Sequence, residues 1–385
     1  MISTKYLYEI HTIQYKELKA QLQNLYQNCV SNNEKIVRLT FFGNPSDNEE
    51  YIKHSNSLHE DVKNLFGLQM PAISYIAQKP IDESGSLIIE ICKLNNDFNG
   101  TVLYKEFENI SYLEIIDNED RELIISGIQS KYLDLGIGVQ ATEIFHTLEN
   151  ILRKEDYPIH SIVRQWNYIE RITDFADNQQ HYQLFNDARS IFYTKTQWPE
   201  GYPAATGIGT QWGGIVIDLN AVKSSEKEYR CIPLDNNLQV AAYDYSQKVL
   251  LGKKDENLKE RTTPKFERAK ALADKSGGII YISGTAAIRG EESLLNVGIE
   301  EQTKITIENI LHLISKDNLL KEDISISGEC SLQILRVYLK NEEDITLAKN
   351  YINKVLPEIP ISYLLANVCR EELLIEIEGI ASFSL

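Results

Sequence analysis

A strand near the carboxyl end of the chain carries two glutamates within an otherwise apolar run. In residues 373–381, the alternation of side chains places Glu376 and Glu378 on one face and Ile375 and Ile377 on the other. Burying a carboxylate in such a strand costs free energy unless the group has a partner or a chemical task. The final strand is therefore the first place to expect a functional site.

A cysteine lies close to this strand in the sequence. Cys369 precedes Glu376 by seven residues, at the point where a turn leads the chain back into the strand. A carboxylic acid and a thiol near one pocket are a plausible proton donor and a plausible nucleophile or shape-determining group. A lone cysteine is also often just a small buried apolar residue.

The final third of the chain has the clearest secondary-structure pattern. Its order is β-α-β-α-β-β, which predicts an α+β fold with the helices on one face of a sheet. The predicted strands cover residues 278–285, 323–340, 363–368 and 373–383, and the predicted helices cover 299–315 and 344–355.

The remaining sequence predicts further α/β structure. Residues 1–150 form a mixed α/β domain, residues 151–245 form a central region, and residues 265–385 form the C-terminal domain. The lysine-rich stretch between the last two, which includes Lys253 and Lys254, is expected to be a surface loop or linker.

Composition excludes several classes of protein. The formal net charge of −17 argues against a general nucleic-acid binder, which needs clustered lysine and arginine. The five cysteines are dispersed, which favours reduced thiols and a cytoplasmic protein. The sequence has neither the apolar region of a signal peptide nor a run long enough to span a membrane.

Metal and cofactor motifs are also absent from the sequence. No HExxH motif or paired His/Cys spacing supports a metal site. Gly207, Gly209, Gly213 and Gly214 do not form a GxGxxG motif, and a strand rather than a helix is predicted after them. We therefore expect neither a metal nor another cofactor.

Several motifs in the final third resemble the Rid (YjgF, reactive-imine deaminase) family. They are Ser283-Gly284 after a strand, residues 337–340, Pro360, and the terminal stretch 375–381. The resemblance implies a Rid/YjgF-like, chorismate-mutase-like C-terminal domain. Rid deaminases usually carry an arginine just after this proline, whereas Ile361 follows here. Imine deamination is therefore a poor hypothesis.

A longer part of the chain is similar to the chorismatases, which remove pyruvate from chorismate. The similarity runs over about residues 160–385, and it implies a degenerate, related α/β domain before residue 150. The matching stretches are residues 165–169, 185–189, 201–209, 233–236, 239–243, 283–286 and 365–370.

The chorismatase resemblance implies a role for both residues of the terminal motif. Loss of pyruvate requires protonation of the methylene carbon of the enolpyruvyl ether, and Glu376 corresponds to the catalytic acid of the family. Glu378 is the alternative, because it shares the same face. A cysteine at the position of Cys369 is typical of the aromatising, 3-hydroxybenzoate-forming type. The adjacent Arg370 either binds substrate or pairs with Glu372.

The two carboxylates of chorismate need cations and hydrogen-bond donors. Arg336, at the end of a core strand, suits bidentate carboxylate binding. Gln239, Tyr243 and Tyr245 alternate in the sequence and could face one pocket. Ala286, in the turn after Ser283-Gly284, is a second position that could influence the product.

The leading hypothesis is thus a cofactor-free chorismatase that forms 3-hydroxybenzoate and pyruvate. Its alternatives are a hydrolytic chorismatase that gives dihydroxycyclohexadienoate, one that gives 4-hydroxybenzoate, and a non-catalytic Rid-like metabolite-binding protein. The expected partner is a small anionic substrate, with no nucleic acid and no membrane. The chain is expected to be a homotrimer or a monomer with an internal Rid-like repeat.

Overall fold

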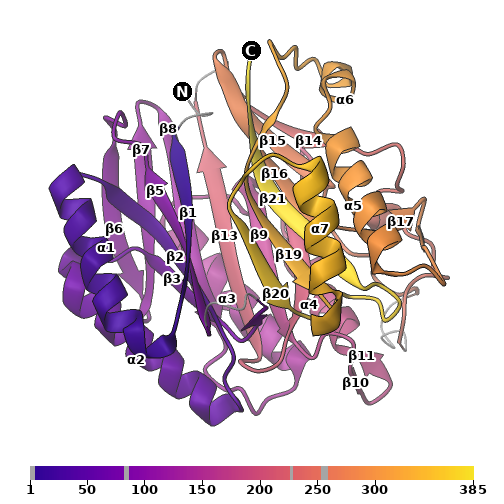
Figure 1. Cartoon of the computed structure of the whole chain (residues 1–385), viewed down its shortest axis with the longest axis horizontal. Helices are drawn as coiled ribbons and strands as arrows, with labels where there is room; N and C mark the ends of the chain where they lie inside the picture. Colours follow the sequence, from indigo (N-terminus) through magenta and orange to yellow (C-terminus); the bar gives the residue numbers. More distant parts are fainter. Residues whose placement is uncertain (1–4, 82–85, 226–228, 253–258) are drawn as a thin grey trace.

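Three mixed β-sheets, each with two long helices on one face, make up most of the chain (Figure 1). The computed structural model describes residues 5–81, 86–225, 229–252 and 259–385. Lys253 and Lys254 of the predicted linker lie outside the described residues. In Figure 1 the helices lie toward the outside of the molecule and the sheets lie between them.

The three sheets share one topology. Each contains the order β-α-β-α-β-β, and in each the last strand lies between the first and the second. In the first sheet the strand order is β1-β5-β2-β3. Its elements are β1 (Tyr6–Ile13), α1 (Leu18–Asn32), β2 (Lys35–Gly43), α2 (Asn48–Phe66), β3 (Ala72–Ile76) and β5 (Leu87–Leu94).

The second sheet adds a hairpin to this arrangement. Its strand order is β12-β9-β13-β8-β7-β6. Its elements are β6 (Thr101–Phe107), β7 (Ile110–Asp117), β8 (Asp120–Gln129), α3 (Ile137–Lys154), β9 (Ile162–Glu170), α4 (His181–Tyr193), β12 (Ala204–Thr210) and β13 (Ile215–Lys223).

The third sheet has the order β14-β15-β16-β21-β19-β20-β4. Its last strand, β4 (Lys79–Pro80), comes from the first part of the chain and ties the two parts together. Its other elements are β14 (Arg230–Leu234), β15 (Ala269–Asp274), β16 (Gly277–Ala286), α5 (Ile299–Leu313), α6 (Lys316–Lys321), β19 (Ser331–Leu339), α7 (Ile345–Val355), β20 (Ile361–Leu365) and β21 (Ile375–Ser384). Two short hairpins complete the described elements: β10 (Phe175–Ala176) with β11 (Gln179–Gln180), and β17 (Ile288–Arg289) with β18 (Glu292–Ser293).

The predicted α+β fold class and the β-α-β-α-β-β order of the final third are confirmed. The strand predicted at residues 323–340 is shorter than expected, because β19 begins only at Ser331. The predicted domain boundary near residue 150 lies inside α3. We propose instead that the chain divides into three repeats, between β5 and β6 and between β13 and β14.

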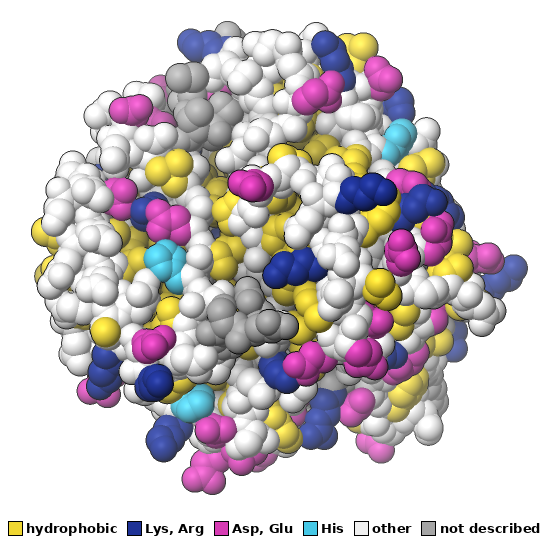
Figure 2. All heavy atoms as spheres, viewed as in Figure 1, with side chains coloured by type: hydrophobic (Ala, Val, Ile, Leu, Met, Phe, Trp, Pro, Cys, Tyr) yellow, Lys and Arg dark blue, Asp and Glu magenta, His cyan; other side chains and the backbone are white. Residues whose placement is uncertain are grey.

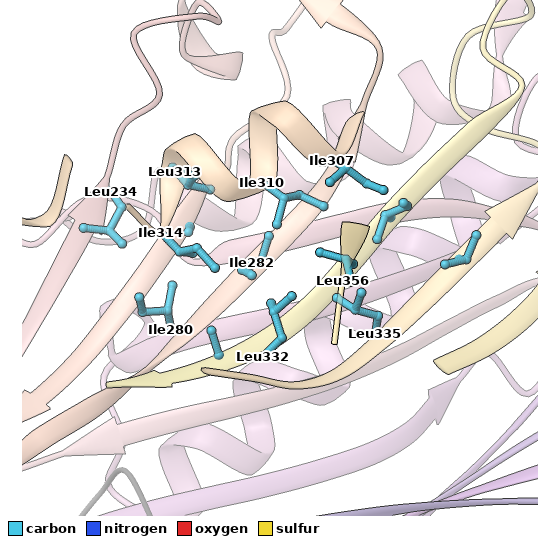
Figure 3. Packing of buried hydrophobic residues seen from close by; sticks show 14 of the residues in the cluster. Leu234, Ile280, Ile282, Ile307, Ile310, Leu313, Ile314, Leu332, Leu335 and Leu356 are labelled. Carbon is cyan, nitrogen blue, oxygen red and sulfur yellow. The ribbon is translucent and has the colours of Figure 1, made fainter. Parts of the chain in front are cut away.

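Apolar side chains between helices and sheet form the core of the third repeat. The β21 residues Ile375 and Ile377 are fully buried on this side, as the alternation in the sequence predicted. Figure 3 shows how α5 covers the sheet with one apolar face. The labelled residues are Leu234, Ile280, Ile282, Ile307, Ile310, Leu313, Ile314, Leu332, Leu335 and Leu356.

The other faces of the sheets meet one another, and buried carboxylates join them. Glu90, Asp218 and Glu378 occupy the same position in the last strand of each repeat, opposite Thr40, Trp166 and Arg336 respectively. All three acids are nearly inaccessible to solvent. Their equivalence indicates that the three repeats are arranged around a common centre.

Each of these acids accepts a hydrogen bond from a hydroxyl group of another repeat. Ser74 donates to Asp218 (2.7 Å), Thr206 donates to Glu378, and Ser362 donates to Glu90 (2.6 Å). The donors are equivalent too, since each lies on the third strand of its repeat. The first repeat thus contacts the second, the second contacts the third, and the third contacts the first.

We predict that Ser362→Ala destabilises the protein, because Oε1 of the buried Glu90 loses its hydrogen-bond donor. Leaving a buried acceptor unsatisfied costs about 1–3 kcal/mol. The denaturant midpoint measures this change. Ser331→Ala, at an exposed hydroxyl at the start of β19, is the control. It should change the free energy of unfolding by less than about 0.5 kcal/mol. Equal effects of the two variants would contradict a structural role for the hydroxyl–carboxylate contacts.

Candidate active site

A pocket lies where the second repeat meets the third. Its floor consists of β12 from the second repeat together with β16 and β21 from the third, and α4 contributes one wall. The segment after Tyr245 and the turn around Cys369 close the remaining sides. Five of the residues considered in the sequence line this pocket: Glu376, Cys369, Tyr245, Ala286 and Arg370.

Glu376 enters the pocket from β21 and packs against the backbone of the neighbouring strand. The strand β16 has an irregularity at Ser283-Gly284, where its register with β21 shifts. A Cβ atom at Gly284 would overlap the Glu376 carboxyl group. Glycine is therefore needed here for close approach of the side chain to the backbone, which explains the Ser-Gly motif found in the sequence.

The carboxyl group of Glu376 is held in its neutral form. Burial raises its pKa to about 8, and the charge of Glu378 acts in the same direction, while Arg164 and Arg268 oppose it. Among the described residues, no hydrogen bond to this carboxyl group is found. A neutral carboxylic acid without a protein partner, facing a pocket, can give its proton to a bound molecule.

Cys369 is a thiol rather than a thiolate. Burial raises its pKa to about 12, and the neighbouring Glu376 adds to this shift. A thiol with so high a pKa is a poor nucleophile at neutral pH. The geometry therefore favours a role in shaping the pocket over covalent catalysis.

Two arginines and a tyrosine form a cluster beside the acid. The Arg268 guanidinium donates to the Tyr245 hydroxyl (2.7 Å), and the Arg370 guanidinium lies over the Tyr245 ring, 5.1 Å from its centroid. Arg370 also donates to the carbonyl of Glu291 (2.8 Å). Within the described part of the chain, the buried Nε of Arg268 has no hydrogen-bond partner. This cluster suits an anionic ligand.

Three predicted site residues lie elsewhere. Arg336 is buried among the sheets, where it pairs with Glu90 (2.7 Å) and Glu378 (3.2 Å), so its charge is already used. Gln239 donates to the Ile288 carbonyl (3.4 Å). The ring of Tyr243 packs against Tyr202. The structure does not bring Arg336, Gln239 or Tyr243 into the lining of this pocket.

Several lining residues could not be predicted from the sequence, because they come from other parts of the fold. Gln180, Tyr182 and Asn186 belong to the second repeat, and Arg268 precedes β15. The Nε2 of Gln180 is buried and, among the described residues, lacks a partner. Only the helical spacing of Gln183 and Asn186 hinted at a polar face on α4.

The described residues contain no group of three His, Cys, Asp or Glu side chains arranged to hold a metal ion. In the same part of the chain, no helix has the length and apolar character needed to cross a membrane. On the face shown in Figure 2, acidic and basic side chains are interspersed rather than gathered into a basic stripe.

We predict that Glu376 makes the stability of the protein fall as the pH rises. The folded-state pKa of about 8 exceeds the ordinary value of 4.5. The stabilisation from the bound proton is therefore complete below pH 4.5 and is lost as the pH approaches about 8, by at most about 1.4 kcal/mol per pH unit.

The measurement is the free energy of unfolding of the wild type and of Glu376→Gln across this pH range. The difference between the two proteins isolates this carboxyl group, since the amide cannot titrate. A constant difference between pH 5 and pH 8 would show that Glu376 is ionised in the folded protein throughout.

The family model and the relatives that match this chain point to the same family of proteins. Residues 104–221 match the family model described as chorismatase FkbO/Hyg5-like, N-terminal. A 3-hydroxybenzoate synthase of Streptomyces hygroscopicus is 32% identical over 234 residues, which are 59% of this chain and 65% of the relative. A chorismatase of Streptomyces rapamycinicus is 29% identical over 238 residues, which are also 59% of this chain and 65% of that relative. The alignments thus cover slightly less than two thirds of these relatives.

A solved structure has the same fold. A crystal structure of a chorismatase matches with a TM-score of 0.70 at 20% identity, and the match covers 99% of this chain and 99% of that one. The resemblance inferred from the sequence is thereby confirmed: the chain is similar to the chorismatases, because residues 104–221 match a chorismatase family model and nearly the whole chain has the fold of a solved chorismatase.

Proposed function

We propose that this chain is a chorismatase that converts chorismate into 3-hydroxybenzoate and pyruvate without a cofactor. The observation that carries the proposal is the neutral carboxyl group of Glu376, which faces a pocket and has a pKa of about 8. Two relatives, a 3-hydroxybenzoate synthase and a chorismatase, support the choice of substrate.

Glu376 serves as the general acid of the first step. It transfers its proton to the methylene carbon of the enolpyruvyl group, and the neighbouring carbon becomes an oxocarbenium centre. An ordinary glutamate would be ionised at neutral pH and could not donate, so burial of Glu376 is what makes the step possible.

Arg268 and Arg370 bind the substrate carboxylates, in place of the Arg336 suggested by the sequence. Both line the pocket, and the buried Nε of Arg268 lacks a partner among the described residues. The unpartnered Nε2 of Gln180 is a further donor. Charge-assisted hydrogen bonds of this kind are about twice as strong as neutral ones.

The ring hydroxyl of the substrate then captures the oxocarbenium centre. The Glu376 carboxylate takes the proton of this hydroxyl and returns it to the oxygen as the bond between the oxygen and the ring breaks, and it then takes the proton lost by the adjacent ring carbon. The resulting hemiketal collapses to 3-hydroxybenzoate and pyruvate. This route consumes no water. Cys369 fills the space beside Glu376 with a neutral thiol and so directs the reaction away from attack by water.

Hydrolysis to pyruvate and dihydroxycyclohexadienoate is the second candidate, because attack by water on the same centre needs the same acid. A route to 4-hydroxybenzoate and non-catalytic metabolite binding have no particular observation in their favour. The predicted lack of a cofactor and the cytoplasmic location stay predictions. The homotrimer and the monomer with an internal Rid-like repeat likewise both stay predictions.

We predict that the purified protein forms pyruvate and 3-hydroxybenzoate from chorismate without added metal. In deuterium oxide the methyl group of pyruvate gains one deuterium, because the exchangeable proton of Glu376 is transferred to carbon. Glu376→Gln should lower kcat by roughly 10²–10⁴-fold. Chromatography with mass spectrometry identifies the products. Unchanged turnover by Glu376→Gln would exclude this residue as the acid.

We predict that Cys369→Ala changes the product rather than abolishing turnover. The smaller side chain leaves room for water beside the oxocarbenium centre, so dihydroxycyclohexadienoate increases at the expense of 3-hydroxybenzoate. The product ratio at equal total conversion is the measurement. Cys231→Ala, at a cysteine on β14 outside the pocket lining, is the matched control and should leave the ratio unchanged. An unchanged ratio for Cys369→Ala would remove the role given to this thiol.

A further inference from the structure

A second buried glutamate lies beside the proposed acid. Glu378 follows Glu376 by two residues on β21, on the same face, which separates their Cα atoms by roughly 7 Å. Only 1% of Glu378 is exposed. It does not line the pocket that contains Glu376, and it faces a second cavity among the three sheets. Glu378 therefore has no direct access to a substrate in the first pocket.

Four donors surround the Glu378 carboxylate. Arg164 and Thr206 donate to Oε2, while Tyr338 (2.6 Å) and Arg336 (3.2 Å) donate to Oε1. Every partner is a donor, and a carboxylate accepts four such bonds only when it is ionised. The guanidinium groups of Arg164 and Arg336 hold the pKa of Glu378 below its usual range despite the burial.

We propose that Glu378 is a positioning residue whose fixed negative charge keeps the proton on Glu376. This inference rests on the proposed function and deepens it, because it names the group that prepares the acid. A second negative charge on the buried Glu376, close to the first, would be strongly disfavoured. Glu376 consequently retains its proton while Glu378 stays ionised.

Other groups around Glu376 could also influence its proton. Arg164 on β9 and Arg268 before β15 favour the ionised form. Burial raises the pKa of the Cys369 thiol and of the Tyr182 hydroxyl, so both are neutral at physiological pH, and Arg370 is a further cation in the lining. The positive charges therefore work against burial, which favours the neutral form of Glu376. Among the described charged groups around this acid, Glu378 is the one that opposes them.

The equivalent positions in the other repeats support this assignment. Glu90 and Asp218 correspond to Glu378, but Ile88 and Val216 stand where Glu376 would be. The buried carboxylate at the centre is thus a structural feature of all three repeats. In the third repeat alone it lies next to a second acid, Glu376, and there its charge influences whether that acid is protonated.

The test compares Glu378→Gln with Glu90→Gln. Each variant removes one buried carboxylate that is paired with Arg336, and Glu378→Gln also removes the ion-pair partner of Arg164. We expect the alkaline limb of the kcat/KM profile to fall by roughly one to two pH units in Glu378→Gln, because a negative charge about 7 Å from Glu376 is lost. The limb should stay in place in Glu90→Gln. An unmoved or raised limb in Glu378→Gln would overturn the proposal, as would equal shifts in both variants.

An infrared titration provides a second measurement if Glu378→Gln does not fold. The wild type should show a carboxylic acid C=O band that disappears near pH 8, and this band should be absent from Glu376→Gln. Buried Asp218 and Glu267 also have raised pKa values, so the informative signal is the difference between the wild type and Glu376→Gln. A difference spectrum without this band would show that Glu376 holds no proton and would overturn the proposal. Failure of the proposed function is distinguishable, because the wild type would then not turn over chorismate although the infrared result could still hold.

Discussion

The arrangement of the whole molecule depends on three buried carboxylates that each accept a hydrogen bond from another repeat. Glu90, Asp218 and Glu378 sit at equivalent places, and the hydroxyls of Ser362, Ser74 and Thr206 reach them across the three junctions. A buried carboxylate without donors is very costly. The repeats must therefore meet in one relative arrangement, which apolar packing alone would specify less sharply.

The same arrangement creates three junctions, yet only one carries the acid in a pocket. The β8 strand of the second repeat has the same register shift at Ser126-Gly127, opposite Asp218, that β16 has at Ser283-Gly284, opposite Glu378. The backbone that cradles Glu376 is thus not unique to the third repeat. What distinguishes the third repeat is the side chain two residues earlier, which is Val216 in the second and Glu376 in the third.

The local features of the final strand could be predicted from the sequence, whereas its partners could not. Alternation placed Glu376 and Glu378 on one face, but period two cannot reveal that one faces a pocket and the other a cluster of arginines. Arg336 suited carboxylate binding, yet its charge is used by Glu90, 246 residues away. Arg268 and Gln180 were missed for the same reason. Each belongs to a segment whose position depends on how the repeats meet.

The charges around Glu376 act on its proton in opposite directions, and Glu378 adds to the effect of burial. Binding a dianion requires cations such as Arg268 and Arg370 near the acid, and these same cations favour ionisation of Glu376. A fixed negative charge behind the acid offsets their effect on the proton without occupying the pocket. A bound dianionic substrate adds negative charge on the other side, so the acid holds its proton more firmly in the complex than in the empty pocket. Binding of the anionic substrate and retention of the proton on Glu376 therefore do not conflict, because Arg268 and Arg370 serve the first requirement and Glu378 serves the second.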